Sequence, residues 1–131
     1  MGGSWIVPGF IDLHGHGGGG HSYDDSAEEI LAAVATHRSH GTTRSILSLV
    51  ANPIAQLRAS LAVIADLAEA HPTILGSHLE GPFLAEDKRG AHNPAYLKAP
   101  LPFEVEELIG AAHGTLRQLT IAPELPGALE A

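Results

Sequence analysis

Alternation of apolar, strand-forming runs with helical segments is the feature that most limits the folds open to this chain of 131 residues. The strand-forming runs are expected at residues 5–13, 42–50, 73–80 and 116–122. The helices are expected at residues 26–41, 52–72 and 103–113. Because such alternation favours a parallel sheet with helices on its outside, the sequence predicts an α/β fold.

The expected helices carry recognisable end signals. Ser26 begins the run S-A-E-E, in which Glu29 can reach back to the Ser26 amide as in a capping box, and Gly41 is the expected stop. Asn52 is expected to cap the second helix, with Pro53 in its first turn. The last five residues, GALEA, have the character of the first turn of a further helix.

The apolar spacing predicts which side chains form the core. The first strand is expected to be short and buried. The residues expected on the inward faces of the second and third helices are Leu57, Leu61, Ile64, Leu67, Leu108 and Ile109.

Two architectures fit this order of elements: a small open α/β sheet, or the first half of a (β/α)₈ barrel with about four parallel strands and outer helices. In both, functional side chains gather at the carboxyl ends of the strands.

Charge and composition exclude several classes of function. Seven basic and fifteen acidic residues give a formal net charge of −8, and no basic patch follows the chain, so we expect no nucleic-acid partner. The chain has no cysteine, and any metal must therefore be held by imidazole and carboxylate groups. A cytoplasmic location fits this composition, and no export or membrane-spanning segment is visible in the sequence.

A histidine pair follows the first strand. In an extended strand, Asp12, His14 and His16 share one face. Two imidazoles at this spacing can reach one cation, and Asp12 could orient one of them. The alternative is a solvated loop rich in histidine and glycine, and the spacing alone leaves both interpretations open. His21, beyond four glycines, stays undecided.

A carboxylate ends the third strand, in the run HLEGPF. Glu80 shares a face with His78 and could complete a His-His-Glu set with the histidine pair. The alternative is that Glu80 caps a helix or pairs with Lys88 or Arg89 in the loop that follows.

The loop KRGAHNP after the third strand holds His92 and Asn93, which could bond a sugar hydroxyl or a carbonyl, or could simply form an ordinary turn. Four further histidines lie at the ends of helices, where we expect structural roles: His37, His40, His71 and His113.

Together these motifs resemble the N-acetylglucosamine-6-phosphate deacetylases, a branch of the amidohydrolase superfamily. The similar stretches are PGFIDLHGHGGGG (8–20), HLEGPFL (78–84), KRGAHNP (88–94) and LTIAPE (119–124). The resemblance extends from about Trp5 to the end of the chain. HLEGPFL together with GAHNP is typical of this branch, whereas the first stretch alone indicates only the superfamily.

The resemblance implies a cytoplasmic, metal-dependent hydrolase that converts N-acetylglucosamine 6-phosphate to glucosamine 6-phosphate and acetate. It implies that His14, His16 and Glu80 bind one or two divalent metal ions. Zinc is the metal expected. It also implies that Ala91 and His92 contact the sugar of an amino-sugar phosphate. A deacetylase of another amino-sugar phosphate is the alternative within the same chemistry.

The chain departs from the family in its extent. Family members carry a small β-sandwich and a second half of the barrel, which supplies two more metal-binding histidines, the phosphate-binding residues and the proton-shuttling aspartate. We therefore assign no catalytic residue here, and expect residues 1–4 to be a linker or a remnant of expression and residues 5–131 to be a half-barrel fragment.

The isolated fragment is expected to be inactive and to form homo-oligomers through exposed sheet edges. The rival interpretation from another class is a non-catalytic, metal-binding or self-assembling half-barrel.

Overall fold

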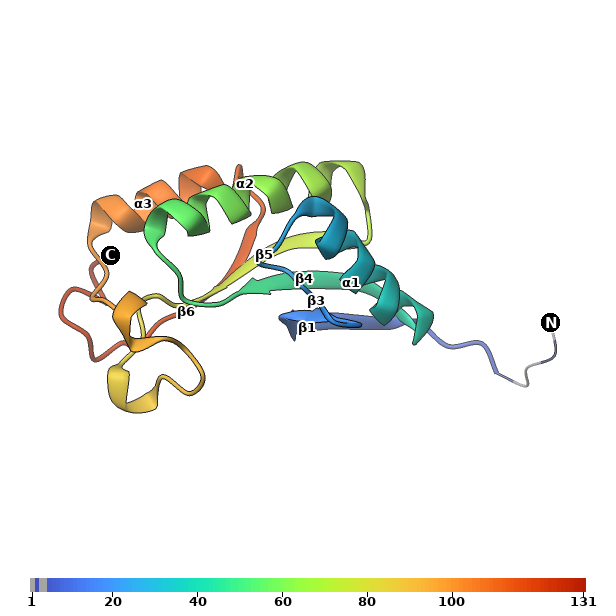
Figure 1. The fold of residues 1–131 in the computed structure, drawn as a ribbon, viewed down its shortest axis with the longest axis horizontal. Coiled ribbons are helices and arrows are strands. Elements are labelled where there is room, and N and C mark those ends of the chain that lie inside the picture. Colours follow the sequence, from blue (N-terminus) through green and yellow to red (C-terminus); the bar gives the residue numbers. More distant parts are fainter. Residues whose placement is uncertain (1, 3–4) are drawn as a thin grey trace.

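The computed structural model of the chain describes residue 2 and residues 5–131. Four strands form one parallel sheet, in the spatial order β1 (Phe10–Gly15), β4 (Thr42–Leu49), β5 (Ile74–Glu80) and β6 (Leu116–Thr120). The linking helices are α1 (Ala27–Ser39), α2 (Ile54–Ala70) and α3 (Pro102–Ala111), and they lie on one side of the sheet (Figure 1). The predicted parallel α/β fold with outer helices is confirmed. The linker predicted at residues 1–4 lies, apart from residue 2, outside the described residues.

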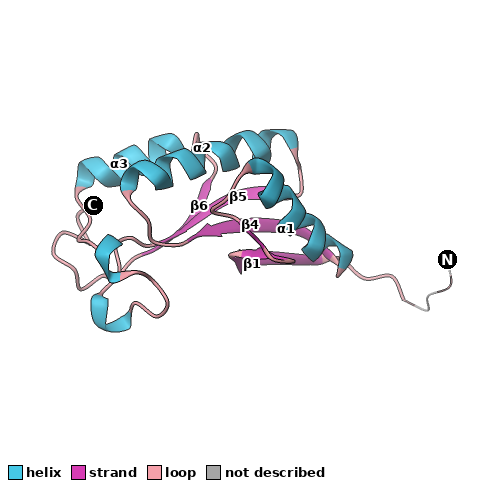
Figure 2. Ribbon diagram, in the orientation of Figure 1, coloured by secondary structure: helices cyan, strands magenta, loops and turns pink. Residues whose placement is uncertain are grey.

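Small elements extend the loops at the carboxyl ends of the strands. A hairpin of β2 (Gly17–Gly18) and β3 (His21–Ser22) follows β1, and its turn is made by Gly19 and Gly20 with φ angles of 65° and 89°. Such positive φ values suit glycine because it has no Cβ. The loop after β5 contains two short 3₁₀ helices, η1 (Glu86–Lys88) and η2 (Pro94–Tyr96), which lie together beyond the strand ends (Figure 2).

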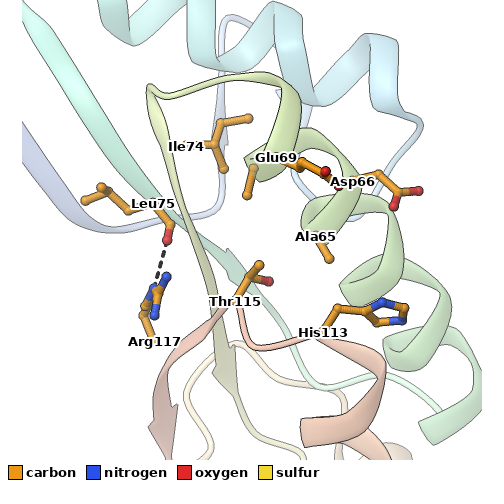
Figure 3. A pocket seen from close by; sticks show the side chains of 9 residues that line it. Ala65, Asp66, Glu69, Ile74, Leu75, His113, Thr115 and Arg117 are labelled. Carbon is orange, nitrogen blue, oxygen red and sulfur yellow. Dashed lines mark hydrogen bonds between the residues drawn. The ribbon is translucent and has the colours of Figure 1, made fainter.

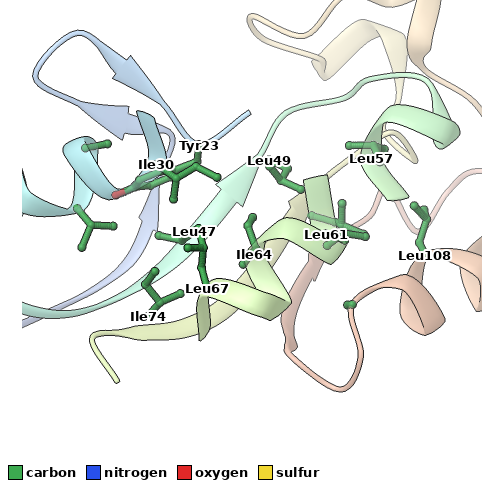
Figure 4. Close-up of a cluster of buried hydrophobic side chains, with 14 of the residues drawn as sticks. Tyr23, Ile30, Leu47, Leu49, Leu57, Leu61, Ile64, Leu67, Ile74 and Leu108 are labelled. Atoms are coloured by element: carbon green, nitrogen blue, oxygen red, sulfur yellow. The ribbon is translucent and has the colours of Figure 1, made fainter. Parts of the chain in front are cut away.

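The hydrophobic core lies between the sheet and the helices (Figure 4). The four leucine and isoleucine residues predicted on the inward face of α2 are all buried. They pack with a cluster whose largest fully buried other members are Tyr23, Ile30, Leu47, Leu49, Leu79, Phe83 and Leu108. The helical period therefore predicted this face correctly, because a stripe repeating every three to four residues faces one neighbour.

The first strand differs from its prediction. It begins at Phe10 rather than Trp5, and it is exposed: Phe10, Ile11 and Leu13 have 70%, 58% and 51% of their surface accessible. β1 pairs with β4 on one side only, and Pro8 just before it has no N–H to donate to a ladder. Apolar composition alone could not reveal that this strand lies at an edge of the described sheet.

Three helix predictions also need correction. The N-cap of α2 is Pro53, and Asn52 instead donates its side-chain N–H to Asp24 Oδ1 at 3.4 Å. Ile109 is 51% exposed, whereas its neighbour Leu108 is buried, because successive residues in a helix point about 100° apart. The residues GALEA form turns rather than the start of a helix. No helix in the described part of the chain is long and apolar enough to cross a membrane.

Candidate metal centre

The predicted His-His-Glu set comes together at the carboxyl ends of β1 and β5. Glu80 Oε2 lies 2.8 Å from His16 Nε2 and 3.4 Å from His14 Nε2. The two Nε2 atoms are 3.2 Å apart, and one ligand atom from each residue lies within 4.8 Å of the others. β4 separates these strands, and its residue Ser48 pairs with His78 of β5 and lies beside His16.

The hydrogen bonding of His16 prepares it as a ligand. Its Nδ1 lies 3.1 Å from the carbonyl oxygen of Ser48, which can only accept, so Nδ1 carries the proton and donates it. In the neutral ring, Nε2 then presents a lone pair toward Glu80 and His14. Two imidazole nitrogens and one carboxylate oxygen are a donor set suited to a divalent cation, and the residues present therefore fit such an ion.

The surrounding imidazoles keep the carboxylate ionised. Burial alone would raise the pKa of Glu80, but the neighbouring His14, His16 and His92 side chains outweigh it and hold the pKa below its ordinary value. Glu80 is therefore in the deprotonated form that a metal requires. Within the described residues it forms no ion pair with Lys88 or Arg89, the alternative that its sequence position had left open.

His78 lies directly under the cluster. It is 3% exposed, and its ring packs edge-on against the His14 ring, with centroids 4.9 Å apart. Its Nδ1 lies 2.9 Å from Ser48 Oγ and its Nε2 lies 2.8 Å from Thr120 Oγ1. Both nitrogens are thus engaged, so His78 packs against the cluster without a free nitrogen to join it. Alternation along β5 predicted its face, but not these partners.

Burial and, next, the charge of His14 lower the pKa of His78, while Glu80 opposes this effect. The His78 ring is therefore neutral near pH 7.

The loop after β5 folds back onto the site. The Ala51 N–H donates to His92 Nδ1 at 3.1 Å, so the proton of the neutral His92 ring lies on Nε2, which is 3.5 Å from Glu80 Oε2. A cavity of about 330 Å³ opens here. Its lining includes His16, Glu80, Ala91, His92, Asn93 and Tyr96. The predicted sugar-contacting residues therefore lie beside the predicted metal ligands.

Asp12 departs from the predicted arrangement. β1 and β4 pair Asp12 with Ser45 and Gly15 with Leu47, so three steps along β1 match two along β4. This β-bulge breaks the alternation, and Asp12 faces the helices rather than the cluster. Its Oδ1 accepts the main-chain N–H of His14 at 3.2 Å rather than a ring N–H.

Two of the remaining histidines, His21 and His37, connect the glycine hairpin and α1. His21, undecided from sequence, pairs with Glu29 of α1, so the Glu29 side chain is drawn away from the predicted capping box. Ser26 Oγ still accepts the Glu29 N–H at 3.4 Å. His37 Nε2 donates to the Gly17 carbonyl at 2.8 Å and ties the glycine hairpin to α1.

A second cavity, of about 460 Å³, lies at the opposite end of the sheet (Figure 3). It is bounded by the amino ends of β5 and β6 and by α2, and Arg117 Nε donates to the Leu75 carbonyl at 2.9 Å on its wall. In α/β folds of this kind the amino ends of the strands serve stability and the carboxyl ends carry chemistry. The cavity beside Glu80 is therefore the candidate functional site.

Comparison with known proteins places the chain in a family. The model of the amidohydrolase family matches residues 5–130. The N-acetylgalactosamine-6-phosphate deacetylase of Escherichia coli O157:H7 is 35% identical over 130 residues, covering 96% of this chain and 34% of the relative. The N-acetylglucosamine-6-phosphate deacetylase of Vibrio furnissii is 34% identical over 134 residues, covering 96% of this chain and 33% of that relative. The chain thus spans about a third of the length of these relatives.

Solved structures give the same relationship. The N-acetyl-D-glucosamine-6-phosphate deacetylase of Mycobacterium smegmatis superimposes with a TM-score of 0.90 at 42% identity, covering 95% of this chain and 35% of that one. The N-acetylglucosamine-6-phosphate deacetylase of Thermotoga maritima gives a TM-score of 0.83 at 28% identity, covering 94% and 33%. The sheet with its helices therefore corresponds to one part of a larger fold, as the predicted partial barrel requires.

Proposed function

Because the chain belongs to the amidohydrolase family, we propose that it is part of a metal-dependent hydrolase that deacetylates N-acetylglucosamine 6-phosphate to glucosamine 6-phosphate and acetate. The observation that carries this proposal is the convergence of His14, His16 and Glu80 at the carboxyl ends of two strands. A divalent metal is implied by the family and by this cluster, and we propose zinc, which imidazole and carboxylate ligands suit.

The proposed ligands are His14, His16 and Glu80. Ser48 holds His16 in the tautomer that frees Nε2, and the imidazoles around Glu80 keep its pKa low, so that it is a carboxylate. A bound divalent cation would supply polarisation of the acetamide carbonyl and a lowered pKa for a water molecule.

The proposed substrate contacts are Ala91 and His92, in the cavity beside the cluster. With its Nδ1 occupied by the Ala51 N–H, His92 points Nε2–H toward the site, where it can donate to a carbonyl or hydroxyl oxygen of the sugar. The cavity volume of about 330 Å³ is at the lower end of the range typical of small-molecule sites.

Zinc titration tests the metal site. We expect calorimetry to detect zinc binding by the chain. In the double variant His14→Ala/His16→Ala, binding should weaken by more than the roughly 100-fold that loss of an outer-shell partner can cost. The variant His71→Ala, which changes a histidine after the end of α2 and outside the cluster, is the matched control and should bind like the unchanged chain.

Acetate release from N-acetylglucosamine 6-phosphate, measured in the same samples, should be little or none, because the chain spans about a third of the length of its relatives.

Absence of zinc binding by the unchanged chain would contradict the metal site and favour a non-catalytic scaffold. Measurable turnover, free of contaminating enzyme, would contradict the proposed inactivity of the isolated chain.

A deacetylase of another amino-sugar phosphate is the second candidate. It is favoured by the 35% identity to an N-acetylgalactosamine-6-phosphate deacetylase. Chemical-shift changes at Ala91 and His92 in the zinc-loaded chain, compared between the two N-acetylhexosamine 6-phosphates, distinguish the candidates.

Two further properties belong to the same proposal. A cytoplasmic location follows from the substrate class, because a sugar phosphate carries a charge that keeps it from crossing a membrane unaided. Self-association follows from the exposed edge strands β1 and β6, which each pair with one neighbour among the described strands.

A further inference from the structure

The orientation of His14 depends on an irregularity in β1. The strand pairs Asp12 with Ser45 and Gly15 with Leu47, so one residue between them is extra. In a regular strand, His14 would take the place opposite Leu47, whose side chain is in the core between sheet and helices. The bulge moves His14 to the other face, where its ring packs against His78.

The Asp12 carboxylate accepts a main-chain hydrogen bond at this bulge. A bulge leaves a main-chain N–H without its partner in the ladder, and such a group needs another acceptor. Asp12 Oδ1 accepts the N–H of His14 two residues along, as in an Asx turn. Gly15 leaves space for the carboxylate, since a Cβ at this position would lie only 3.2 Å from Asp12 Oδ2.

We propose that Asp12 is a positioning residue for the metal cluster, acting by accepting the His14 main-chain N–H and so stabilising the bulge that turns His14 toward His16 and Glu80. The relevant property is the oxygen acceptor and not the negative charge, because the partner is a neutral amide. The metal-binding consequence of this inference rests on the proposed function, whereas the orientation of His14 does not.

Zinc affinity separates the acceptor from the charge. Asp12→Ala removes both, and we expect it to weaken zinc binding about 10- to 100-fold, as loss of an outer-shell partner does. Asp12→Asn keeps the oxygen acceptor without the charge and should bind zinc within about threefold of the unchanged chain. Asp66→Ala, which removes an exposed carboxylate on α2, is the control and should change nothing. Equal zinc affinity for Asp12→Ala and the unchanged chain, or an Asp12→Asn variant as weak as Asp12→Ala, overturns the inference.

A metal-free measurement keeps the inference separate from the proposed function. In the unchanged chain and in Asp12→Asn, NMR should show a protected His14 amide and a nuclear Overhauser effect between the His14 and His78 rings. Both signals should be lost in Asp12→Ala while the melting temperature shows that the chain is folded. If that variant does not fold, Asp12→Ser takes its place, and because its hydroxyl can accept the same N–H, both signals should persist.

Persistence of the ring contact in Asp12→Ala, or its absence from the unchanged chain or from the Ser variant, contradicts the proposal whether or not zinc binds. Failure of the unchanged chain to bind zinc with the ring contact intact would count against the proposed function alone.

Discussion

At the scale of single residues, Tyr23 carries a polar hydroxyl into the hydrophobic core. Its side chain is fully buried, and its hydroxyl has no hydrogen-bond partner among the described residues. Burial, with a smaller contribution from the charge of Asp12, raises the pKa of Tyr23 from 10.0 to about 12. A buried hydroxyl without a partner costs stability, because in the unfolded chain it bonds to water.

Replacement of Tyr23 by phenylalanine should therefore raise the free energy of unfolding, by about 1 kcal/mol. It should also remove an alkaline sensitivity. Between pH 10 and pH 12 the hydroxyl ionises in the unfolded chain but not in the folded one, so the free energy of unfolding falls as pH rises through this range. Urea unfolding at pH 7 and at a series of alkaline pH values measures both effects, with Tyr96→Phe as control. A destabilised Tyr23→Phe variant would show that the hydroxyl has a partner.

At the scale of elements, a chain of side-chain hydrogen bonds joins β4, β5 and β6 beside the cluster of His14, His16 and Glu80. Ser48 Oγ bonds to His78 Nδ1, and His78 Nε2 bonds to Thr120 Oγ1. A neutral imidazole has one donor and one acceptor nitrogen, and a hydroxyl can supply either partner. The three neighbouring strands are thus held together at one level by side chains as well as by their ladders.

Thr120→Val should lower the free energy of unfolding by about 1 kcal/mol, because it removes the partner of His78 Nε2 at nearly constant side-chain volume. Thr120→Ser keeps the hydroxyl and should lose less. Chemical denaturation of the two variants side by side provides the measurement. Equal losses would mean that the hydrogen bond contributes nothing.

At the scale of the whole molecule, the sheet has two open edges. β1 and β6 each have one neighbouring strand in the described structure, and Phe10, Ile11 and Leu119 on these edges are exposed. Exposed edge strands with apolar side chains favour pairing with another chain. The net charge of −8 opposes association, but salt screens such charges within roughly 10 Å at 0.1 M.

We therefore expect sedimentation at physiological salt to show a dimer or a larger species. The double variant Phe10→Lys/Leu119→Lys should shift the population toward monomer, because it adds charge to both edges. Leu129→Lys, at a residue 82% exposed in the terminal turns, is the control and should leave the association unchanged. A monodisperse monomer of the unchanged chain would refute the proposed self-association.

Several features of the site were predictable because their signals are local. Alternation put Glu80 and His78 on one face of their strand, and the spacing of His14 and His16 allowed both imidazoles to reach one cation. The face of Asp12 was not predictable, because a one-residue bulge leaves no trace in the pattern of apolar and polar residues. The cap at Asn52 failed for a similar reason: its side chain bonds to Asp24, a residue distant in the sequence.

The sequence by itself determined the order of strands and helices, the parallel class of the sheet and the residue types at the strand ends, because periodicity and capping act over a few residues. Only the tertiary structure decided that His14 and His16 meet Glu80 across β4, and that β1 lies at an edge. These outcomes depend on strand order, register and one bulge, which arise from packing between segments far apart in the chain.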